Sequence, residues 1–262
     1  MIITTGRGAD PTIVKRAEDL SRRTNNVYIP RMNGSLARLA AKHKNEDVIV
    51  VLEQGARLFR SGQLPMEFHP SMGFVRAKRI LKGEYDPMLD SSGITLGNTV
   101  LDCTAGLGTD SLVFAVKAGP SGSVTAIESS EALSVLLMEG LATYSSDNAE
   151  VNEAMRRISV RHGHHLDVLR SMPDASFDIV YFDPMFREPM LESASISPLR
   201  SFANPDALSE ESIAEAIRVA RKTVVLKEKR GSSEFARLGF TSDERQSKIA
   251  YGVISVDSAK HN

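Results

Sequence analysis

The sequence predicts an α/β protein built on a doubly wound, mostly parallel sheet, with a small amino-terminal α/β subdomain before it. From Thr99 onward, short apolar segments alternate with segments whose apolar residues recur at helical spacing, as a parallel sheet with crossover helices requires. A shorter alternation of the same kind precedes residue 70. With 262 residues, of which 42% are hydrophobic and 25% charged, the chain is long and apolar enough to bury such a core.

Residues 1–68 are predicted to form the small subdomain. Short β-branched segments alternate there with segments of helical periodicity. The expected order is strand 2–5, helix 12–22, strand 27–29, helix 35–43 and strand 48–52. Residues 62–65 are interpreted as a connector, because their glycine and proline interrupt helices and strands alike.

Residues 69–262 are predicted to form the main domain, which begins with a lead-in helix over 71–81 and a linker that together span 69–98. The expected order after this linker is strand 99–102, helix 110–118, strand 123–127, helix 131–142, strand 157–160, strand 177–182, helix 209–221 and strand 222–227. Helical connections allow neighbouring strands to run parallel, so five parallel strands are expected. The weakly alternating segment 248–256 is expected to add a late strand at the sheet edge.

Composition narrows the class of protein. No apolar run approaches the roughly 18 residues of a membrane span, and the first residues lack the pattern of a secretion signal, so a cytoplasmic protein is expected. The single cysteine, Cys103, and six scattered histidines show no metal-ligand spacing. We therefore expect no metal site.

The net charge of −1 conceals an asymmetry along the chain. Residues 1–90 hold 15 lysines and arginines against 10 aspartates and glutamates, so this part is basic. Such side chains suit the phosphate backbone of RNA, although charged runs also form ordinary solvated helix faces. The candidates are Arg22, Arg23, Lys42, Lys44, Arg76, Lys78, Arg79 and Lys82.

A glycine-containing turn, from Asp102 to Asp110, leaves an apolar strand and opens a helix. Gly106 and Gly108 allow the backbone to turn tightly and approach a ligand beyond the carboxyl ends of the strands. A dinucleotide fingerprint would place a third glycine at position 111, where Ser111 stands. The turn therefore favours a ligand other than a pyrophosphate.

The next two strand ends are expected to border the same ligand. Glu128 ends the second strand of the main domain, where a carboxylate accepts hydrogen bonds from both ribose hydroxyls of an adenosine. This geometry serves NAD and S-adenosylmethionine alike, so it indicates an adenosine ligand rather than a reaction. His164 and His165 follow the third strand. Side chains of adjacent residues diverge, which favours a polar pocket wall over a metal site.

The segment Asp183-Pro184-Met185-Phe186 ends the fourth strand and is the most informative motif. An exocyclic base amine is a poor nucleophile because its lone pair is delocalised into the ring. The Asp183 carboxylate and the Pro184 carbonyl can accept both of its N–H bonds, while Phe186 stacks on the base. An ordinary Asp-Pro turn is the structural alternative. The position of the motif, at the switch point where ligand crevices form, favours the catalytic interpretation.

Three segments together resemble the small-subunit ribosomal RNA guanine-N2 methyltransferases, a family of class I S-adenosylmethionine-dependent methyltransferases. They are 102–110, 180–186 and 224–227, and Glu139-Gly140-Leu141 also matches a helix of that family. The resemblance covers roughly residues 98–227. It implies a seven-stranded, Rossmann-like methyltransferase sheet, S-adenosylmethionine as the cofactor, S-adenosylhomocysteine as the product and RNA as the partner.

The resemblance also implies a set of cofactor contacts beyond the turn residues Asp102, Gly106 and Gly108. The contacts that it adds come from Thr109, Asp110, Glu128, Ser129, His164, His165 and Asp183. The family usually has basic residues at the positions of Thr109 and Ser129, and small hydroxyl residues at those of the two histidines. These departures leave methyl transfer as the expected chemistry and leave the RNA target open.

We therefore expect a methyltransferase that acts on an exocyclic base amine, with guanine N2 of ribosomal RNA as the first candidate. A methyltransferase for DNA adenine, a protein amide or a small molecule is the alternative, and a non-catalytic adenosine-binding or RNA-binding module is a third. Asp183 and Phe186 favour an enzyme, because a binding module does not need an amine-acceptor pair. The residues leave open the methylated nucleotide, the oligomeric state and the role of segment 187–205.

Overall fold

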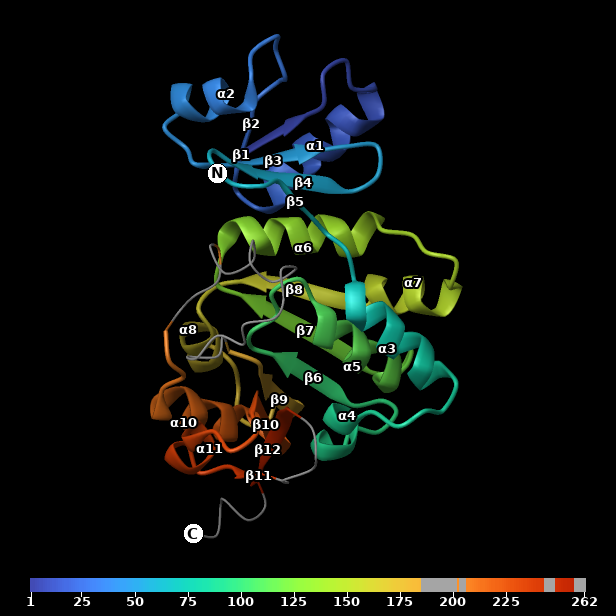
Figure 1. The fold of residues 1–262 in the computed structure, drawn as a ribbon, viewed down its shortest axis with the longest axis vertical. Helices are drawn as coiled ribbons and strands as arrows, with labels where there is room; N and C mark the ends of the chain where they lie inside the picture. The colour runs from blue at the N-terminus through green and yellow to red at the C-terminus, as the bar shows by residue number, and fades with distance from the viewer. Residues whose placement is uncertain (185–201, 203–205, 243–247, 257–262) are drawn as a thin grey trace.

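The protein consists of two α/β units, each built on one sheet, that lie one after the other along the long axis of the molecule. The structure is a computed structural model, which describes residues 1–184, 202, 206–242 and 248–256. A five-stranded sheet has the order β2-β1-β3-β4-β5, and a seven-stranded sheet has the order β11-β12-β10-β9-β6-β7-β8. Figure 1 shows the smaller sheet at one end of the molecule and helix α6 between the two sheets.

The amino-terminal unit contains the elements predicted for it and two further strands. Its elements are β1 (Ile2–Thr5), α1 (Pro11–Arg23), β2 (Val27–Tyr28), α2 (Leu36–Lys42), β3 (Asp47–Val51), β4 (Ala56–Arg60) and β5 (Met66–Glu67). β1 pairs in parallel with β2 and β3, whereas β4 and β5 continue the sheet in antiparallel pairs. The sequence did not predict β4 and β5, because charged residues interrupt their short apolar pattern on the exposed face.

The remaining elements form the larger unit. They are α3 (Ser71–Leu81), α4 (Pro87–Ser92), β6 (Thr99–Asp102), α5 (Thr109–Ala118), β7 (Ser123–Glu128), α6 (Glu131–Thr143), α7 (Ala149–Arg156), β8 (Ile158–His162), α8 (His165–Arg170), β9 (Phe177–Phe182), α10 (Glu210–Val219), β10 (Ala220–Lys229), α11 (Ser233–Arg237), β11 (Thr241–Ser242) and β12 (Ile249–Ser255). Strands β6 to β10 all run parallel, which confirms the five parallel strands that the sequence predicts. Their carboxyl ends therefore share one edge.

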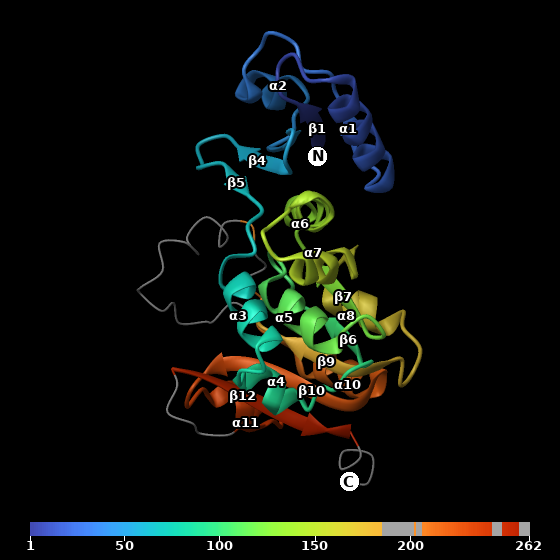
Figure 2. The same ribbon diagram turned by 90° about the vertical axis from the view of Figure 1, so that its right-hand side faces the viewer.

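Helices cover both faces of the larger sheet, as Figure 2 shows from the side. The side chains of β9 alternate between the two cores. Ile179 and Tyr181 pack into the core that contains α3 to α7, whereas Val180 and Phe182 pack into the core on the α8 and α10 side. This alternation has the period of two that a strand imposes, and it produces the doubly wound arrangement. None of the described helices is long and apolar enough to cross a membrane.

The last strand departs from its predicted place. β12 pairs antiparallel with both β10 and β11, so it lies one strand inside the edge that the sequence assigned to it. The two-residue strand β11 forms that edge instead. Short helices α4, α7, α8 and α11 were also not predicted, because each has at most eight residues and stays below the length at which periodicity is informative.

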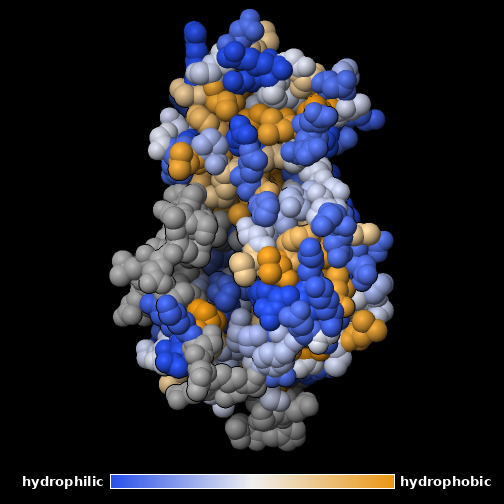
Figure 3. All heavy atoms as spheres, turned by 45° about the vertical axis from the view of Figure 1, so that its right-hand side comes forward, coloured by the Kyte–Doolittle hydropathy of each residue, from blue (hydrophilic) through white to orange (hydrophobic). Residues whose placement is uncertain are grey.

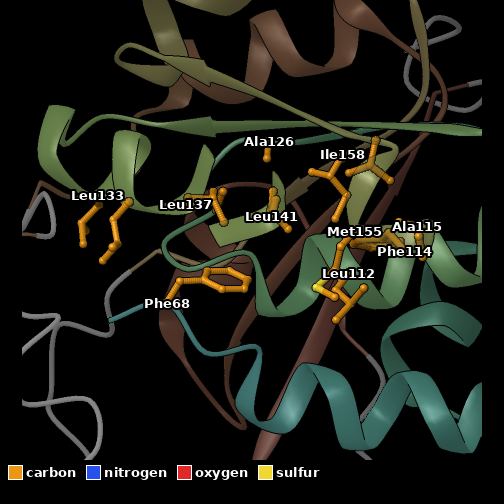
Figure 4. Packing of buried hydrophobic residues seen from close by; sticks show 14 of the residues in the cluster. Phe68, Leu112, Phe114, Ala115, Ala126, Leu133, Leu137, Leu141, Met155 and Ile158 are labelled. Carbon is orange, nitrogen blue, oxygen red and sulfur yellow. The ribbon is translucent and has the colours of Figure 1, made fainter. Parts of the chain in front are cut away.

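Helix α6 is apolar on most of its circumference because it packs against both units. Leu133, Leu137 and Leu141 are at most 3% exposed, and Figure 4 shows them in one cluster with Phe68, beneath the helix. Polar contacts with the amino-terminal unit accompany this packing. Arg16 Nε lies 2.8 Å from Glu139 Oε1, which is part of a side chain only 2% exposed. Burial raises the pKa of Glu139, while Arg16 opposes that shift.

We predict that Gly140→Ala destabilises the protein, since a Cβ at Gly140 would lie 2.0 Å from Phe68 Cγ. Overpacking of this kind costs about 1–3 kcal/mol of unfolding free energy, more than the helix propensity that alanine adds. Urea unfolding measures the effect. Ala142→Ser on the exposed face of the same helix is the control. The double variant with Phe68→Ala, which removes the Cγ and Cδ1 atoms that the new Cβ would meet, should lose less stability than the sum of the two single variants. A Gly140→Ala protein as stable as the original would show that Phe68 moves aside freely.

Candidate active site

Acidic residues and one lysine gather at the carboxyl edge of the larger sheet. Asp102 and Glu128 end β6 and β7, and Asp183 directly follows β9. Leu226 of β10 pairs with Phe182 of β9, so Lys227 lies beside Asp183 in the next register position. The parallel topology thus brings together residues that lie far apart in the sequence.

Hydrogen bonds that Asp102 accepts shape the glycine turn. Its Oδ1 accepts a hydrogen bond from the Thr104 N–H at 3.1 Å, and its Oδ2 accepts one from the Ser111 hydroxyl at 2.5 Å. Ser111, at the position of the missing third glycine, is therefore part of the turn's internal support. Gly108 has φ +73°, and a Cβ there would lie 2.8 Å from Leu137 Cδ1, so a larger residue would strain the turn. Burial raises the pKa of Asp102 to about 7.

Glu128 connects the second strand to the same turn. Its Oε2 accepts a hydrogen bond from the Gly106 N–H at 2.9 Å, and its Oε1 accepts one from the Ser130 N–H at 2.7 Å. The Ser129 hydroxyl lies 3.4 Å from Oε1. Burial raises the pKa of Glu128, although these hydrogen bonds favour its charged form. The predicted ribose acceptor is therefore a nearly buried carboxylate fixed by backbone donors.

The two predicted histidines lie on the α8 side of this edge. His164 precedes α8 and accepts a hydrogen bond at Nδ1 from the Leu166 N–H at 3.3 Å. His165 Nε2 lies 3.0 Å from the Ser212 hydroxyl, and its ring meets Phe182 edge to face at 5.6 Å between centroids. Burial lowers the pKa of His165 to about 4, so the ring is neutral at pH 7. Contact of either ring with a cofactor stays a prediction.

Lys227 joins the two carboxylates nearest the proposed chemistry. Its Nζ lies 2.7 Å from Asp183 Oδ2 and 2.9 Å from Asp110 Oδ2. The Tyr181 hydroxyl donates a hydrogen bond of 2.7 Å to the same Asp110 oxygen. The Asp183 N–H donates to the Thr104 hydroxyl at 2.6 Å, which attaches the end of β9 to the glycine turn. Asp183 is therefore held through its backbone by Thr104 and through its side chain by Lys227.

Burial and neighbouring charges shift the pKa values of Lys227, Asp110 and Asp183 in different directions. Burial opposes the charged form of Lys227, but Asp110 and Asp183 outweigh it and hold the lysine pKa above its usual range. Burial also opposes ionisation of Asp110, yet Lys227 and Arg76 hold the pKa of this carboxylate below its usual range. For Asp183, burial wins over Lys227 and raises the pKa to about 6. Asp183 is thus the member of the network that titrates near neutrality.

Arg76 corrects one expectation from the sequence. Its Nε and Nη2 lie 2.8 and 2.9 Å from the two oxygens of Asp86, and its Nη1 contacts Asp110. The Arg76 side chain is only 18% exposed. It is therefore part of the internal ion-pair network and not an RNA contact. Arg79, on the same helix, pairs with Glu84 at 2.6 Å.

Of the remaining predicted residues, the structure describes Thr109 and Pro184 but not Phe186. Thr109 begins α5, and its carbonyl lies 2.7 Å from the position that a Cβ on Gly73 would occupy, so α3 packs closely against this helix start. Pro184 follows Asp183 and is half-buried. Phe186 and nearly all of segment 187–205 lie outside the described residues. In the described parts of the chain, no group of acids, histidines and cysteine has the geometry of a metal site.

The roles of Lys227 and Arg76 could not be seen in the sequence pattern alone. Lys227 stood in a motif but received no function, although a lysine at the end of a buried strand is itself a signal of a paired charge. Arg76 lay in a basic helix, and only the fold shows that its side of the helix faces Asp110. No local pattern places an arginine of α3 against a carboxylate 34 residues away.

Comparisons with known proteins identify relatives of this chain and of its fold. A family model described as "Putative SAM-dependent methyltransferase" matches residues 37–243. The uncharacterized protein YpiP of Bacillus subtilis is 41% identical over 255 residues, which cover 97% of this chain and 98% of that protein. The crystal structure of a SAM-dependent methyltransferase from Neisseria gonorrhoeae superposes with a TM-score of 0.65 at 20% identity, covering 97% of this chain and 96% of the other, and it shows the shared fold.

Similarity also extends to proteins named ribosomal RNA small subunit methyltransferase J. The one from Cronobacter sakazakii is 30% identical over 200 residues, which cover 73% of this chain and 72% of that protein. The one from Aeromonas hydrophila is 33% identical, but the match covers 49% of this chain and 51% of that protein. Because the family model spans most of the sequence, and the fold agrees, the chain belongs to the SAM-dependent methyltransferase family and uses S-adenosylmethionine as its methyl donor.

Proposed function

We propose that the chain methylates an exocyclic base amine of ribosomal RNA, with guanine N2 as the target. The observation that carries this proposal is the position of Asp183. Its side chain is 28% exposed at the carboxyl edge of the sheet, whereas Asp102 and Asp110 are nearly buried. One oxygen of Asp183 is held by Lys227, but the side chain is exposed enough to meet a substrate, which its buried neighbours are not. The ribosomal RNA methyltransferases among the relatives support the substrate class and, with it, a place in the cytoplasm.

The residues at this edge fit S-adenosylmethionine. The Glu128 carboxylate accepts backbone hydrogen bonds from Gly106 and Ser130 and, with about four lone-pair sites, keeps acceptor capacity for ribose hydroxyls. Asp110 is balanced by Arg76 and Lys227. Asp102 and Glu128 make no ion pair among the described residues, and this negative excess near the glycine turn favours a cationic sulfonium over an anionic pyrophosphate. The acids that suit S-adenosylmethionine thus disfavour NAD. The other predicted contacts, from Thr109, Ser129 and the two histidines, remain part of this proposal.

The neighbourhood of Asp183 suits an amine nucleophile. Bound S-adenosylmethionine supplies a methyl group on a cationic sulfur, and S-adenosylhomocysteine results when the N–C bond forms and the S–C electron pair stays on sulfur. The Asp183 carboxylate accepts a hydrogen bond from an N–H of the amine and stabilises the positive charge that develops on nitrogen. The nitrogen then loses that proton to the Asp183 carboxylate, which passes it to water. The Pro184 carbonyl is the second acceptor that we propose. Stacking by Phe186 completes the proposal.

We predict that S-adenosylmethionine and S-adenosylhomocysteine bind, and that NAD does not, in calorimetric titrations. Glu128→Ala should weaken cofactor binding by about 1–3 kcal/mol, the range for losing hydrogen bonds to a charged acceptor. Glu128→Gln, which keeps one acceptor oxygen, should fall between. Glu153→Ala removes an exposed acid of α7 and serves as the matched control. Equal or tighter binding of NAD would overturn the assignment of the adenosine site.

Asp183→Ala should lower turnover on ribosomal RNA by a factor on the order of 100, because one preorganised transition-state contact is lost. Asp183→Asn keeps an acceptor oxygen without the charge and should lie between Ala and the original protein. Lys227 retains Asp110 as a partner in both variants, so the network persists. Methyl incorporation into RNA measures the effect, with thermal unfolding and cofactor affinity as controls. Near-normal turnover of a folded Asp183→Ala protein would remove Asp183 from the mechanism.

The pH dependence of kcat/KM should report the ionisation of Asp183. The carboxylate is a stronger acceptor than the protonated acid and alone carries the charge that stabilises the developing cation, so the rate should rise with pH through a pKa of about 6. Lys227→Met removes the cation that opposes burial and should move this limb to higher pH by about 1–3 units. Lys222→Met is the matched control, because Lys222 lies at the other end of β10 and pairs with Asp178. An unmoved limb in Lys227→Met would mean that another group controls the rate.

A further inference from the structure

Two arginines lie close together in the loops that follow parallel strands of the amino-terminal unit. β1 and β2 pair in parallel, so their carboxyl ends meet at one edge of the smaller sheet. Arg7 follows β1, and Arg31 follows β2. The Arg7 Nη2 donates hydrogen bonds to the carbonyls of Asn33 and Gly34 at 3.1 and 3.4 Å. Arg7 thus ties the two loops together.

This pair has no acidic partner among the residues that the structure describes. Burial lowers the pKa of Arg31, and the neighbouring charge of Arg7 lowers it further. The Nη1 atom of Arg31 is buried and makes no hydrogen bond within the described chain. Desolvating a charged donor without a partner is costly, and a like charge beside it adds to the cost. Two like charges held together in this way favour the binding of an anion.

Other arginines of the same unit contrast with this pair. Arg57 pairs with Glu67, Arg60 lies 2.7 Å from Asp47, and Arg22 pairs with Asp19. The surroundings of the Arg7 loop are also open. Gly8 has φ +63°, and a Cβ on it would have no atom within 4 Å. An anion can therefore approach the backbone of this loop closely.

We propose that Arg7 and Arg31 together bind a phosphate group of the RNA backbone, an inference that rests on RNA being the substrate. Guanidinium groups present planar, paired N–H donors that match phosphate oxygens. The bound phosphate would provide the negative charge that no acidic residue of the described chain places beside the two arginines. Inorganic phosphate shares this chemistry, so the test below separates the two sources.

The position of the pair determines what kind of RNA benefits from it. Figure 1 and Figure 2 show the loops after β1 and β2 at the end of the molecule far from the larger sheet. Figure 3 shows mostly hydrophilic residues at this end. An RNA that reaches both this end and Asp183 must be extended along the molecule. The pair should therefore strengthen the binding of long RNA and leave the methyl-transfer step unchanged.

The first experiment measures binding of a small-subunit ribosomal RNA transcript over a range of salt concentrations. Arg31→Gln and the double variant Arg7→Gln, Arg31→Gln should bind more weakly, the double variant on the order of 10-fold at 0.1 M salt. The slope of log affinity against log salt should fall by about one. Arg57→Gln removes a charge that already has an acidic partner, Glu67, and is the matched control. Affinity and salt slope equal to those of the original protein would overturn the proposal.

The second experiment separates phosphate sources and guards against misfolding. Arg31→Gln removes a charge without a partner, so its midpoint of thermal unfolding in chloride should not fall. Inorganic phosphate, compared with chloride at equal ionic strength, should raise the midpoint of the original protein more than that of Arg31→Gln. If phosphate stabilises but RNA binding is unchanged, the site takes free phosphate and the RNA proposal is overturned. No phosphate effect and no RNA effect would overturn the site itself.

The readouts also distinguish this inference from the proposed function. If the original protein transfers no methyl group to ribosomal RNA, the proposed function fails whatever the arginine variants do. If it does transfer methyl groups, the variants should raise KM for the long transcript with kcat unchanged and S-adenosylmethionine affinity unchanged. A lower kcat with normal RNA affinity would contradict the phosphate role.

Discussion

The ammonium group of Lys227 lies between the carboxylates of Asp110 and Asp183, and the rest of the candidate site is arranged around this contact. Without the lysine, two acids would face each other at the end of a buried sheet, and at least one would be protonated at neutral pH. With it, Asp110 is held as an anion and Asp183 titrates near neutrality. The contact thus separates an acid that stays charged from one whose charge changes near neutral pH.

The same network joins elements that are distant in the sequence. Arg76 of α3 contacts Asp110 of α5 and pairs with Asp86, which also accepts a hydrogen bond from the first turn of α4. Tyr181 reaches Asp110 from β9. Burying so many charges is costly, and such groups are tolerated only when each finds a partner in good geometry. A displacement of any one element would leave a charge unpaired, so the network favours one arrangement of the carboxyl edge.

The sequence was sufficient to predict what depends on local pattern. The parallel strands, the glycine turn and the strand-end position of Asp183 follow from periodicity and from residue type, and the structure confirms the strand arrangement. Patterns could not predict contacts between elements. The basic run of α3 looked like a surface, yet Arg76 faces inward because the close approach of Gly73 to α5 sets the orientation of the helix. The place of β12 also depends on pairing, which its own alternation does not encode.

Helix α6 determines how the two units act as one. Leu137 lies against the glycine turn at Gly108, whereas Gly140, one turn along the helix, lies against Phe68 from the segment that leaves the smaller sheet. The helix that supports the glycine turn is therefore the one that packs against the amino-terminal unit, and Arg16 adds an ion pair to Glu139 across that contact. A ligand held by the amino-terminal unit would consequently have a fixed orientation relative to Asp183. Binding energy gained far from the reacting atoms would then help to orient the amine beside Asp183. Methyl transfer depends on this alignment of the amine with the methyl group.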